Sequence, residues 1–153
     1  PASDRRMKRV AIQADDFDVG GELAALEALG GGGVASFTGV VRGGDGLVAL
    51  ELEHYPAMTQ AQVGRIVDEA MGRWPLLGVS VIHRYGRLEP GARIVFVGTA
   101  SRHRTAALES CAFLIDWMKS DAPFWKKEHF AGGATQWVAA RDEDAVKAQG
   151  WDS

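Results

Sequence analysis

Three lysines lie close together in residues 113–128, which read FLIDWMKSDAPFWKKE. The first, Lys119, continues a series of apolar residues at helical spacing. That series comprises Leu108, Ala112 and Ile115. A lysine on an apolar helix face must be buried, be paired or take part in function. A proline and two aromatic residues precede Lys126 and Lys127, and partly buried amines beside aromatic walls suggest a pocket for an anion or a reacting carbonyl.

The position of Lys119 allows two interpretations. In the functional one, a desolvated amine with a lowered pKa serves as a base, a nucleophile or an anion clamp. In the structural one, the methylenes pack and the amine extends from the helix end, where the helix dipole favours a cation. Lys119 alone leaves both open, and the two later lysines favour the functional interpretation. Of those two, Lys127 is the more typical solvated charge, because Lys126 directly follows Trp125.

A second basic cluster, Arg102, His103 and Arg104, lies between an apolar strand and the start of a predicted helix. Free backbone N–H groups and the helix dipole favour anions there and disfavour arginines. Such an unfavourable arrangement is more common at functional sites, although the arginines could instead pair with acidic residues elsewhere. Arg42 ends another apolar strand, where its guanidinium could offer paired donors to a phosphate or carboxylate.

The sequence lacks the motifs that are typical of several other kinds of functional site. The four histidines show no metal-ligand spacing, so no metal site is expected. The single cysteine, Cys111, lies in an apolar helix, where a thiol is most often inert. The glycines at 30–33 lack the P-loop pattern, and no Gly-x-Ser-x-Gly elbow is present.

Composition narrows the function classes further. The chain has 153 residues, 46% hydrophobic and 24% charged, as in one ordinary globular domain. A formal net charge of −3 disfavours a nucleic-acid binder, and an acidic protein with a local basic cluster suits a small anion. No apolar run long enough for a membrane span is present, and no signal peptide is expected.

The hydrophobic pattern predicts helices at 18–29, 59–74 and 105–119, and strands at 9–14, 34–42, 48–55, 79–88, 93–100 and 135–140. Thr59 and Gln62 match a capping box at the start of the second helix. A turn at 89–91 predicts an antiparallel hairpin, whereas the glycines at 43–46 could form a hairpin turn or a mobile loop. The third helix is apolar on more than one side, which suggests burial or an interface.

This mixture of helices and antiparallel strands indicates the α+β class. No internal repeat and no long linker marks a second domain. We therefore expect a single domain over 1–153, with flexible tails at 1–8 and 143–153.

Five segments of the chain resemble the large, catalytic subunit of molybdopterin synthase, the MoaE family. They are GVASFTGVVR (33–42), LELEHYP (50–56), VIHRYGRLEPG (81–91), VGTASRHR (97–104) and LIDWMKSDAPFWKKE (114–128). The resemblance runs from the first strand to about Arg141, with the motifs in order and correctly spaced. It implies an α/β hammerhead with an additional antiparallel β-sheet.

The resemblance also implies a role in molybdenum-cofactor biosynthesis. The family consists of sulfurtransferases that act on cyclic pyranopterin monophosphate and form the molybdopterin dithiolene. The sulfur arrives as a thiocarboxylate on the C-terminal Gly-Gly of a small, ubiquitin-like sulfur-carrier subunit. Two large subunits form a central homodimer, with a small subunit at each end of a cytoplasmic heterotetramer. No cofactor, metal, nucleic acid or membrane is implied.

By matching motifs, the resemblance implies that Lys119 and Lys126 are catalytic. Substrate binding is expected from these two lysines and from Val40, Val41, Arg42, His103, Arg104, Lys127 and Glu128, with Arg141 as a further candidate. The family commonly has a lysine where this chain has Val40, so the side chain there is a weaker candidate than the backbone. The family completes its pocket across the homodimer, and Arg104 is a candidate for reaching the neighbouring protomer's site.

The implied mechanism is a hypothesis in two parts. Arg42, His103 and Arg104 would hold the substrate phosphate through charge-assisted hydrogen bonds. Lys119 would stabilise negative charge or move protons beside the carbonyl of the carrier tail, with Lys126 as a second cation or acid. Two alternatives stay open: a non-catalytic scaffold that binds a ubiquitin-like carrier tail, and an unrelated enzyme with a phosphate-bearing ligand.

Overall fold

The computed structural model describes residues 6–138 and 150–151. Within these residues the chain forms three helices and two four-stranded sheets. In chain order the elements are β1 (Met7–Gln13), α1 (Val19–Glu27), β2 (Gly33–Val40), β3 (Leu47–His54), α2 (Pro56–Arg73), β4 (Leu76–Arg84), β5 (Gly86–Leu88), β6 (Arg93–Ser101), α3 (Arg104–Ser120), β7 (Phe124–Phe130) and β8 (Thr135–Val138). The predicted α+β class is confirmed.

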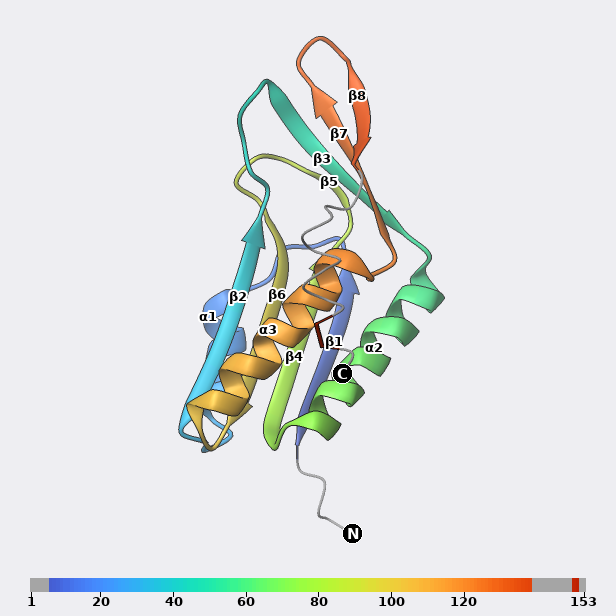
Figure 1. Ribbon diagram of the computed structural model, residues 1–153. Coiled ribbons are helices and arrows are strands. Elements are labelled where there is room, and N and C mark those ends of the chain that lie inside the picture. Colours follow the sequence, from blue (N-terminus) through green and yellow to red (C-terminus); the bar gives the residue numbers. More distant parts are fainter. Residues whose placement is uncertain (1–5, 139–149, 152–153) are drawn as a thin grey trace.

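The first sheet has the strand order β1-β4-β6-β2, in which only β1 and β4 run parallel. Figure 1 shows α2 and α3 across one face of this sheet and α1 behind the other. Strand alternation explains the layers. Val81 and Val97 pack in the cluster beneath α2 and α3, whereas Ile82 and Phe96 pack with Leu26 of α1. Both faces are therefore covered, which explains why β4 and β6 are apolar along most of their length.

The second sheet, with the order β5-β3-β7-β8, projects beyond one end of the first sheet (Figure 1). The chain enters it after β2, through residues 41–46, and again after β4, where β5 begins at Gly86. Residues 43–46 therefore connect strands of two different sheets, and the hairpin predicted as one possibility does not form. Asp45 has a φ of 55° there, between two glycines that also have positive φ.

The structure corrects the predicted start of the second helix. α2 begins at Pro56, and its N-cap residue, Tyr55, makes no side-chain cap hydrogen bond. Proline suits the first helical turn because the N–H that it lacks would have no partner within the helix. Thr59 lies inside the helix and is fully buried, so the predicted capping box of Thr59 and Gln62 is wrong.

Two strand predictions also need correction. Residues 79–88 belong to two strands, because β4 ends at Arg84 and β5 pairs with β3 in the second sheet. The predicted antiparallel pairing of this segment with 93–100 is confirmed for β4 and β6. β7 is a strand that the sequence pattern did not predict. The end of the last predicted strand, at 139–140, lies outside the described residues.

Parts of both predicted tails are packed. Met7 and Lys8 form the start of β1. Near the other end, the ring of Trp151 meets Trp74 and Phe113 edge-on, with centroid distances of 5.8 and 5.6 Å. Its indole N–H also donates to the Asp116 carboxylate at 2.7 Å. Met7, Lys8 and Trp151 are therefore not part of a flexible tail.

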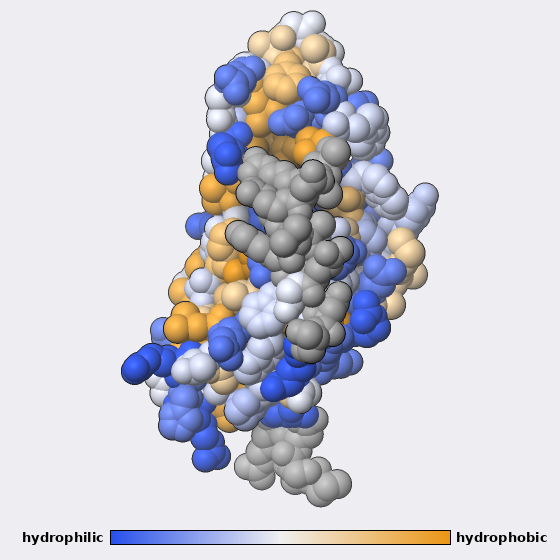
Figure 2. All heavy atoms as spheres, viewed as in Figure 1, coloured by the Kyte–Doolittle hydropathy of each residue, from blue (hydrophilic) through white to orange (hydrophobic). Residues whose placement is uncertain are grey.

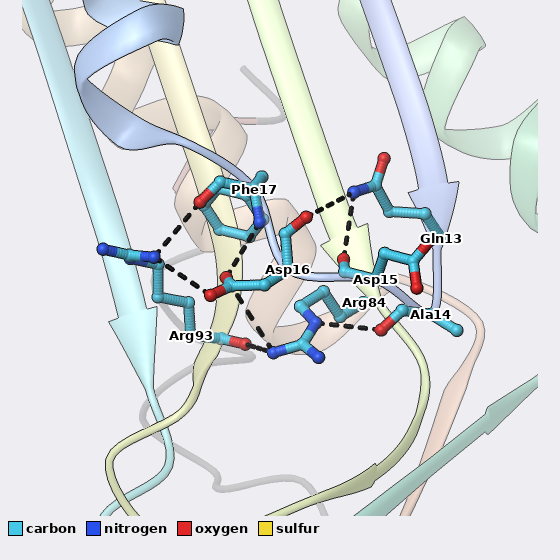
Figure 3. A network of polar contacts seen from close by, with 7 residues as sticks. All are labelled: Gln13, Ala14, Asp15, Asp16, Phe17, Arg84 and Arg93. Carbon is cyan, nitrogen blue, oxygen red and sulfur yellow. Dashed lines mark hydrogen bonds and ion pairs between the residues drawn. The ribbon is translucent and has the colours of Figure 1, made fainter.

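A polar network fixes the connection between β1 and α1 to the ends of β4 and β6 (Figure 3). Arg93 donates to the Asp16 carboxylate and to the carbonyl of Phe17, both at 3.1 Å. Arg84 donates to the carbonyls of Ala14 and Arg93, at 3.0 and 3.1 Å. The backbone N–H of Phe17 is the main cause that lowers the pKa of Asp16. The network thus holds Arg84 where β4 leaves the first sheet.

Candidate active site

Lys119 lies in the last turn of α3 and is exposed. Its Nζ lies 5.7 Å from the centroid of the Phe37 ring on β2, within the range of a cation–π contact. Leu108 and Ala112 of the preceding apolar series are exposed as well, Leu108 at 59%, whereas Ile115 is partly buried against the main core. The interpretation of this series as a buried face is therefore wrong for a single chain. The face that α3 packs against the sheet is a different one, which contains Ala107, Cys111, Leu114 and Trp117.

Lys126 and Lys127 point to opposite faces of the second sheet, because side chains alternate along β7. Lys126 lies opposite Leu52 in the register of β3 and β7, on the face that carries the buried apolar cluster. Lys127 lies opposite Glu51, and its Nζ is 5.4 Å from the centroid of the Trp137 ring. Glu128 lies on the same face as Lys126. The predicted group of Lys126, Lys127 and Glu128 is thus divided by the sheet.

Two histidines lie beside these lysines, although the sequence analysis assigned them no role. His83, near the end of β4, is 4% accessible. Its ring stacks on Phe124 of β7, with a centroid distance of 3.8 Å and an interplanar angle of 15°. His54, at the end of β3, lies 5.7 Å from Phe124 and 4.6 Å from Tyr85, measured between ring centroids. These ring contacts of Phe124 with His83 and His54 join the first sheet to the second.

Burial is the main cause that lowers the pKa of His83 from 6.5 to about 3, and the charges of Lys126, Lys119 and His54 contribute in the same direction. The hydrogen bond to the carbonyl of Arg84 acts in the opposite direction. His83 is therefore neutral at physiological pH. Burial lowers the pKa of His54 as well. The short connection 121–123 joins the end of α3, which carries Lys119, to β7, which carries Lys126. Both lysines therefore lie near the place where the two sheets meet, which is called the junction site below.

The predicted residues at the end of β2 have different environments. Val40 is 53% accessible, whereas Val41 is buried with Leu52 and Leu88. The backbone N–H of Val41 donates to Ala92 and its carbonyl accepts from Gly91, both at 2.8 Å. Arg42 follows and is exposed. The side chain of Val41 and its N–H are thus engaged within the protein, and Arg42 is the group of this segment that could meet an anion.

His103 and Arg104 lie at the opposite end of α3 from Lys119. A rise of 1.5 Å per residue puts Arg104 and Lys119 about 22 Å apart along the helix. Arg104 also lies against the start of β2, since a Cβ added at Gly33 would be 3.2 Å from its Cα. Arg42 follows the other end of that strand. Within one chain, His103 and Arg104 therefore do not lie near Arg42 and Lys119. The hypothesis that Arg42, His103 and Arg104 hold one substrate phosphate would require these residues to lie together. Arg141 lies outside the described residues.

Other chemistry has little support in the part of the chain that the structure describes. No group of three or more His, Cys, Asp or Glu side chains is arranged there as metal ligands. Burial raises the pKa of the Cys111 thiol to about 12, so this thiol is protonated and unreactive. None of the described helices combines the length and apolar character needed to cross a lipid bilayer. The junction site instead offers two ammonium groups beside an apolar wall, which suits an anion or a developing oxyanion.

Known proteins resemble this chain in sequence and in fold. The model of the MoaE protein family matches residues 12–121. A molybdopterin synthase catalytic subunit from Mesorhizobium japonicum is 52% identical over 148 residues, which cover 94% of this chain and 93% of the relative. A molybdopterin biosynthesis MoaE protein from Burkholderia ambifaria is 45% identical, with a TM-score of 0.81 over 96% of this chain and 99% of the other. A complex of subunits 1 and 2 of molybdopterin-converting factor from Helicobacter pylori contains a chain of the same fold, 21% identical, with a TM-score of 0.69 over 88% of this chain and 90% of the other. The chain therefore belongs to the MoaE protein family, whose relatives include catalytic subunits of molybdopterin synthase.

Proposed function

We propose that this chain is the sulfurtransferase subunit of a molybdopterin synthase in the cytoplasm. It would transfer sulfur from the thiocarboxylated C-terminus of a small, ubiquitin-like carrier to cyclic pyranopterin monophosphate, and so form the molybdopterin dithiolene. Membership of the MoaE family supports the reaction. The two-subunit complex from Helicobacter pylori supports a carrier subunit as the partner.

The observation that carries the proposal is the membership of the MoaE family, together with the short connection 121–123 that brings Lys119 of α3 and Lys126 of β7 to one end of the first sheet. The two lysines come from different elements, α3 and β7, and both act electrostatically on His83. Two ammonium groups at an apolar junction would attract the thiocarboxylate of the carrier and the anionic substrate. They would also stabilise the negative charge that develops when sulfur adds to a pterin carbon.

The two lysines have different surroundings, and these surroundings suit different roles. Lys119 is exposed at the end of α3, so it can approach a substrate and a carrier tail directly. Lys126 is half-buried, with its face of β7 turned toward the apolar cluster. We therefore assign Lys119 the stabilisation of charge or the proton transfer at the reacting carbon, and Lys126 the part of a second cation or acid. Arg42 would bind the substrate phosphate from the end of β2.

His103 and Arg104 fit this proposal only if a second copy of the chain completes the site. β2 is an edge strand of the first sheet as described. Leu108 of α3 and Val34 of β2 are apolar and exposed at 59% and 36%. Figure 2 shows apolar residues on the surface where α3 and β2 lie. A homodimer that covers this surface would remove the patch from water and could carry His103 and Arg104 to the partner's lysines.

The reaction can be tested with purified components. Wild-type protein, thiocarboxylated carrier and cyclic pyranopterin monophosphate are expected to yield molybdopterin. Lys119→Ala should lower the rate by at least about a hundredfold, the loss typical when a group that stabilises transition-state charge is removed. Lys8→Ala is the matched control, because Lys8 pairs with Asp68 on another surface, at 2.8 Å.

The outcomes separate the candidate functions. Wild-type rates in Lys119→Ala would remove Lys119 from the mechanism. A wild-type protein that binds the carrier but forms no product would support the non-catalytic scaffold. Product formation without a carrier protein would point to an unrelated enzyme.

A further inference from the structure

Trp151 contacts two helices that are far from it in the sequence. Its ring meets Trp74, which directly follows α2, and Phe113 of α3 edge-on, with centroid distances of 5.8 and 5.6 Å. Aromatic rings attract each other in this arrangement. Figure 1 shows residues 150–151, at the red end of the colour bar, between these two helices. The C-terminal end of the described chain is therefore held against both α2 and α3.

The indole ring also packs beside the main core. Trp151 lines a cavity of about 310 Å³ together with Ile66 of α2 and with Phe113 and Trp117 of α3. These three residues belong to the core and are at most 8% accessible. Loss of the indole would widen this cavity and remove packing contacts from its walls. Any test of a polar role of Trp151 must therefore be separated from this packing.

The polar end of the indole has a charged partner, the carboxylate of Asp116 on α3. The Nε1–H group donates to Asp116 Oδ2 at 2.7 Å. A hydrogen bond to an ionised acceptor is stronger than one between neutral groups. Within the described residues no cation forms an ion pair with Asp116, so the indole is the group that fixes the direction of this carboxylate.

Lys119 lies three residues after Asp116 on the same helix. Residues three apart are neighbours on a helix surface, and opposite charges at this spacing attract each other. The two side chains are nevertheless turned apart. Lys119 directs its Nζ to the ring of Phe37 on β2, 5.7 Å from the centroid, whereas Asp116 directs its carboxylate to Trp151. α3 thus carries an acid beside the proposed catalytic lysine, and Trp151 binds that acid.

Two other cations lie near this cluster, and both come from α2. Arg73 lies over an aromatic ring of the cluster and pairs with Glu69 at 3.3 Å. Arg65 is exposed and lines the same cavity as Trp151. Arg65 would therefore compete with Lys119 for a released carboxylate, whereas Arg73 already has a partner.

We propose that Trp151 is a positioning residue of the sulfur-transfer site, which fastens the C-terminal end of the chain to α2 and α3 and holds the carboxylate of Asp116 away from Lys119. The inference rests on the proposed function for its kinetic consequence and not for its geometry. Trp151 does not touch the reacting atoms. Without its N–H group, Asp116 pairs with Lys119, and the amine must leave that pair before it can act on the substrate.

A substitution that keeps the ring isolates the hydrogen bond. Trp151→Phe retains an aromatic side chain and removes the N–H donor. We expect kcat to fall by about two- to fivefold, because an exposed ion pair must be broken before Lys119 can act. Trp137→Phe is the matched control, since Trp137 is exposed on β8 and contacts Lys127. That variant should leave kcat unchanged.

A second substitution identifies the carboxylate as the cause of the loss. Asp116→Asn keeps an oxygen that can accept from Trp151 and removes the charge that can pair with Lys119. In a protein with Asp116→Asn, the further change Trp151→Phe should therefore leave kcat as it was. A ring that only packs predicts the same loss in both backgrounds. An equal loss in the two backgrounds, or no loss in Trp151→Phe alone, would overturn the proposal.

Nuclear magnetic resonance tests the same geometry without any assay of activity. The indole N–H of Trp151 should exchange slowly with water, and Asp116→Ala should remove this protection, whereas Asp116→Asn should keep it. In Trp151→Phe the side-chain signals of Lys119 should shift, and Asp116→Asn should cancel the shift. Unshifted signals of Lys119, with or without a shift of those of Arg65, would contradict the inference even in an active enzyme. A wild-type protein with a protected indole that forms no product would contradict the proposed function alone.

Discussion

Lys126 and Lys127 are consecutive residues of β7 whose side chains lie on opposite faces of the second sheet. Lys126 lies on the face that carries the apolar cluster and acts on the buried ring of His83. Lys127 contacts the exposed ring of Trp137 on the other face. Two lysines that look interchangeable in the sequence thus have different surroundings, and we propose that only Lys126 belongs to the junction site.

Substitution of each lysine tests this division. Lys126→Ala should lower kcat for molybdopterin formation by at least about tenfold, because it removes a cation from the side of the sheet where charge would develop. Lys127→Ala is the matched control and should keep kcat within about twofold of wild type, since it removes an exposed cation–π contact of about 0.5–1 kcal/mol. Steady-state kinetics with both substrates would measure the two effects. Equal losses of kcat in the two variants would show that activity does not depend on which face of β7 carries the lysine.

The hydrogen bond between His129 and Glu51, 2.8 Å long, predicts a dependence of stability on acid. The hydrogen bond from His129 is the main cause that lowers the pKa of Glu51 below 4.5. A carboxyl with a lowered folded-state pKa stabilises the fold above its unfolded pKa and loses that contribution as pH falls through the folded value. The free energy of unfolding should therefore decrease below about pH 4.5.

Glu51→Gln checks the assignment. The pair is partly exposed, so its contribution is less than about 1 kcal/mol. Urea unfolding of both proteins between pH 3 and pH 7 should show a difference in stability near neutral pH that shrinks in acid. A constant difference across this range would mean that the carboxylate of Glu51 is not the titrating group.

The sequence led to the site by an argument that was only partly correct. Lys119 attracted attention as a lysine on an apolar helix face, but most of that face, including Leu108 and Ala112, is exposed. α3 has a second apolar series, which includes Ala107 and Leu114, and periodicity alone does not tell which series meets the sheet. The choice is made by the tertiary packing of α3 on β2 and β6, which no local pattern encodes.

β7 and His83 escaped prediction for different reasons. The strand FWKKEHF has few apolar residues, because one of its faces is solvated and the other carries Lys126 and Glu128. His83 was sought as a metal ligand, although its alternation with Val79 and Val81 already indicated a buried face of the strand. The sequence thus indicated the helices, most strands and the lysines, while the position of the second sheet depended on pairings between distant segments.

The exposed apolar face of α3 predicts self-association. Leu108→Glu should shift the protein from dimer to monomer, because it places a charge in the proposed contact while leaving the packed face of α3 intact. Val48→Glu is the matched control, since Val48 is exposed on β3 in the second sheet. Analytical ultracentrifugation at several protein concentrations would measure the oligomeric state. A wild-type monomer at all concentrations would contradict the proposed homodimer.

A site that is shared between two copies makes a sharper prediction. Lys119→Ala and Arg104→Ala should each be inactive alone, because each removes one of the groups assigned to the shared pocket. In a mixed dimer, one pocket would carry both changes, and the other would combine the intact Lys119 of one copy with the intact Arg104 of its partner. With random exchange, the mixture should recover roughly a quarter of wild-type activity, since half of the dimers are mixed and half of their pockets are intact.

The control for this experiment is a pair of changes on the same side of the shared pocket. Lys119→Ala and Lys126→Ala both affect groups that one chain supplies to the junction site, so every pocket of their mixed dimer lacks one lysine. That mixture should show no activity beyond the residual activity of the two single variants under the same exchange conditions. Recovery with Arg104→Ala and not with Lys126→Ala would assign Arg104 to the partner's pocket. If neither mixture recovers activity although exchange is complete, the pocket is not shared, and the separation of about 22 Å along α3 would exclude Arg104 from the site of Lys119.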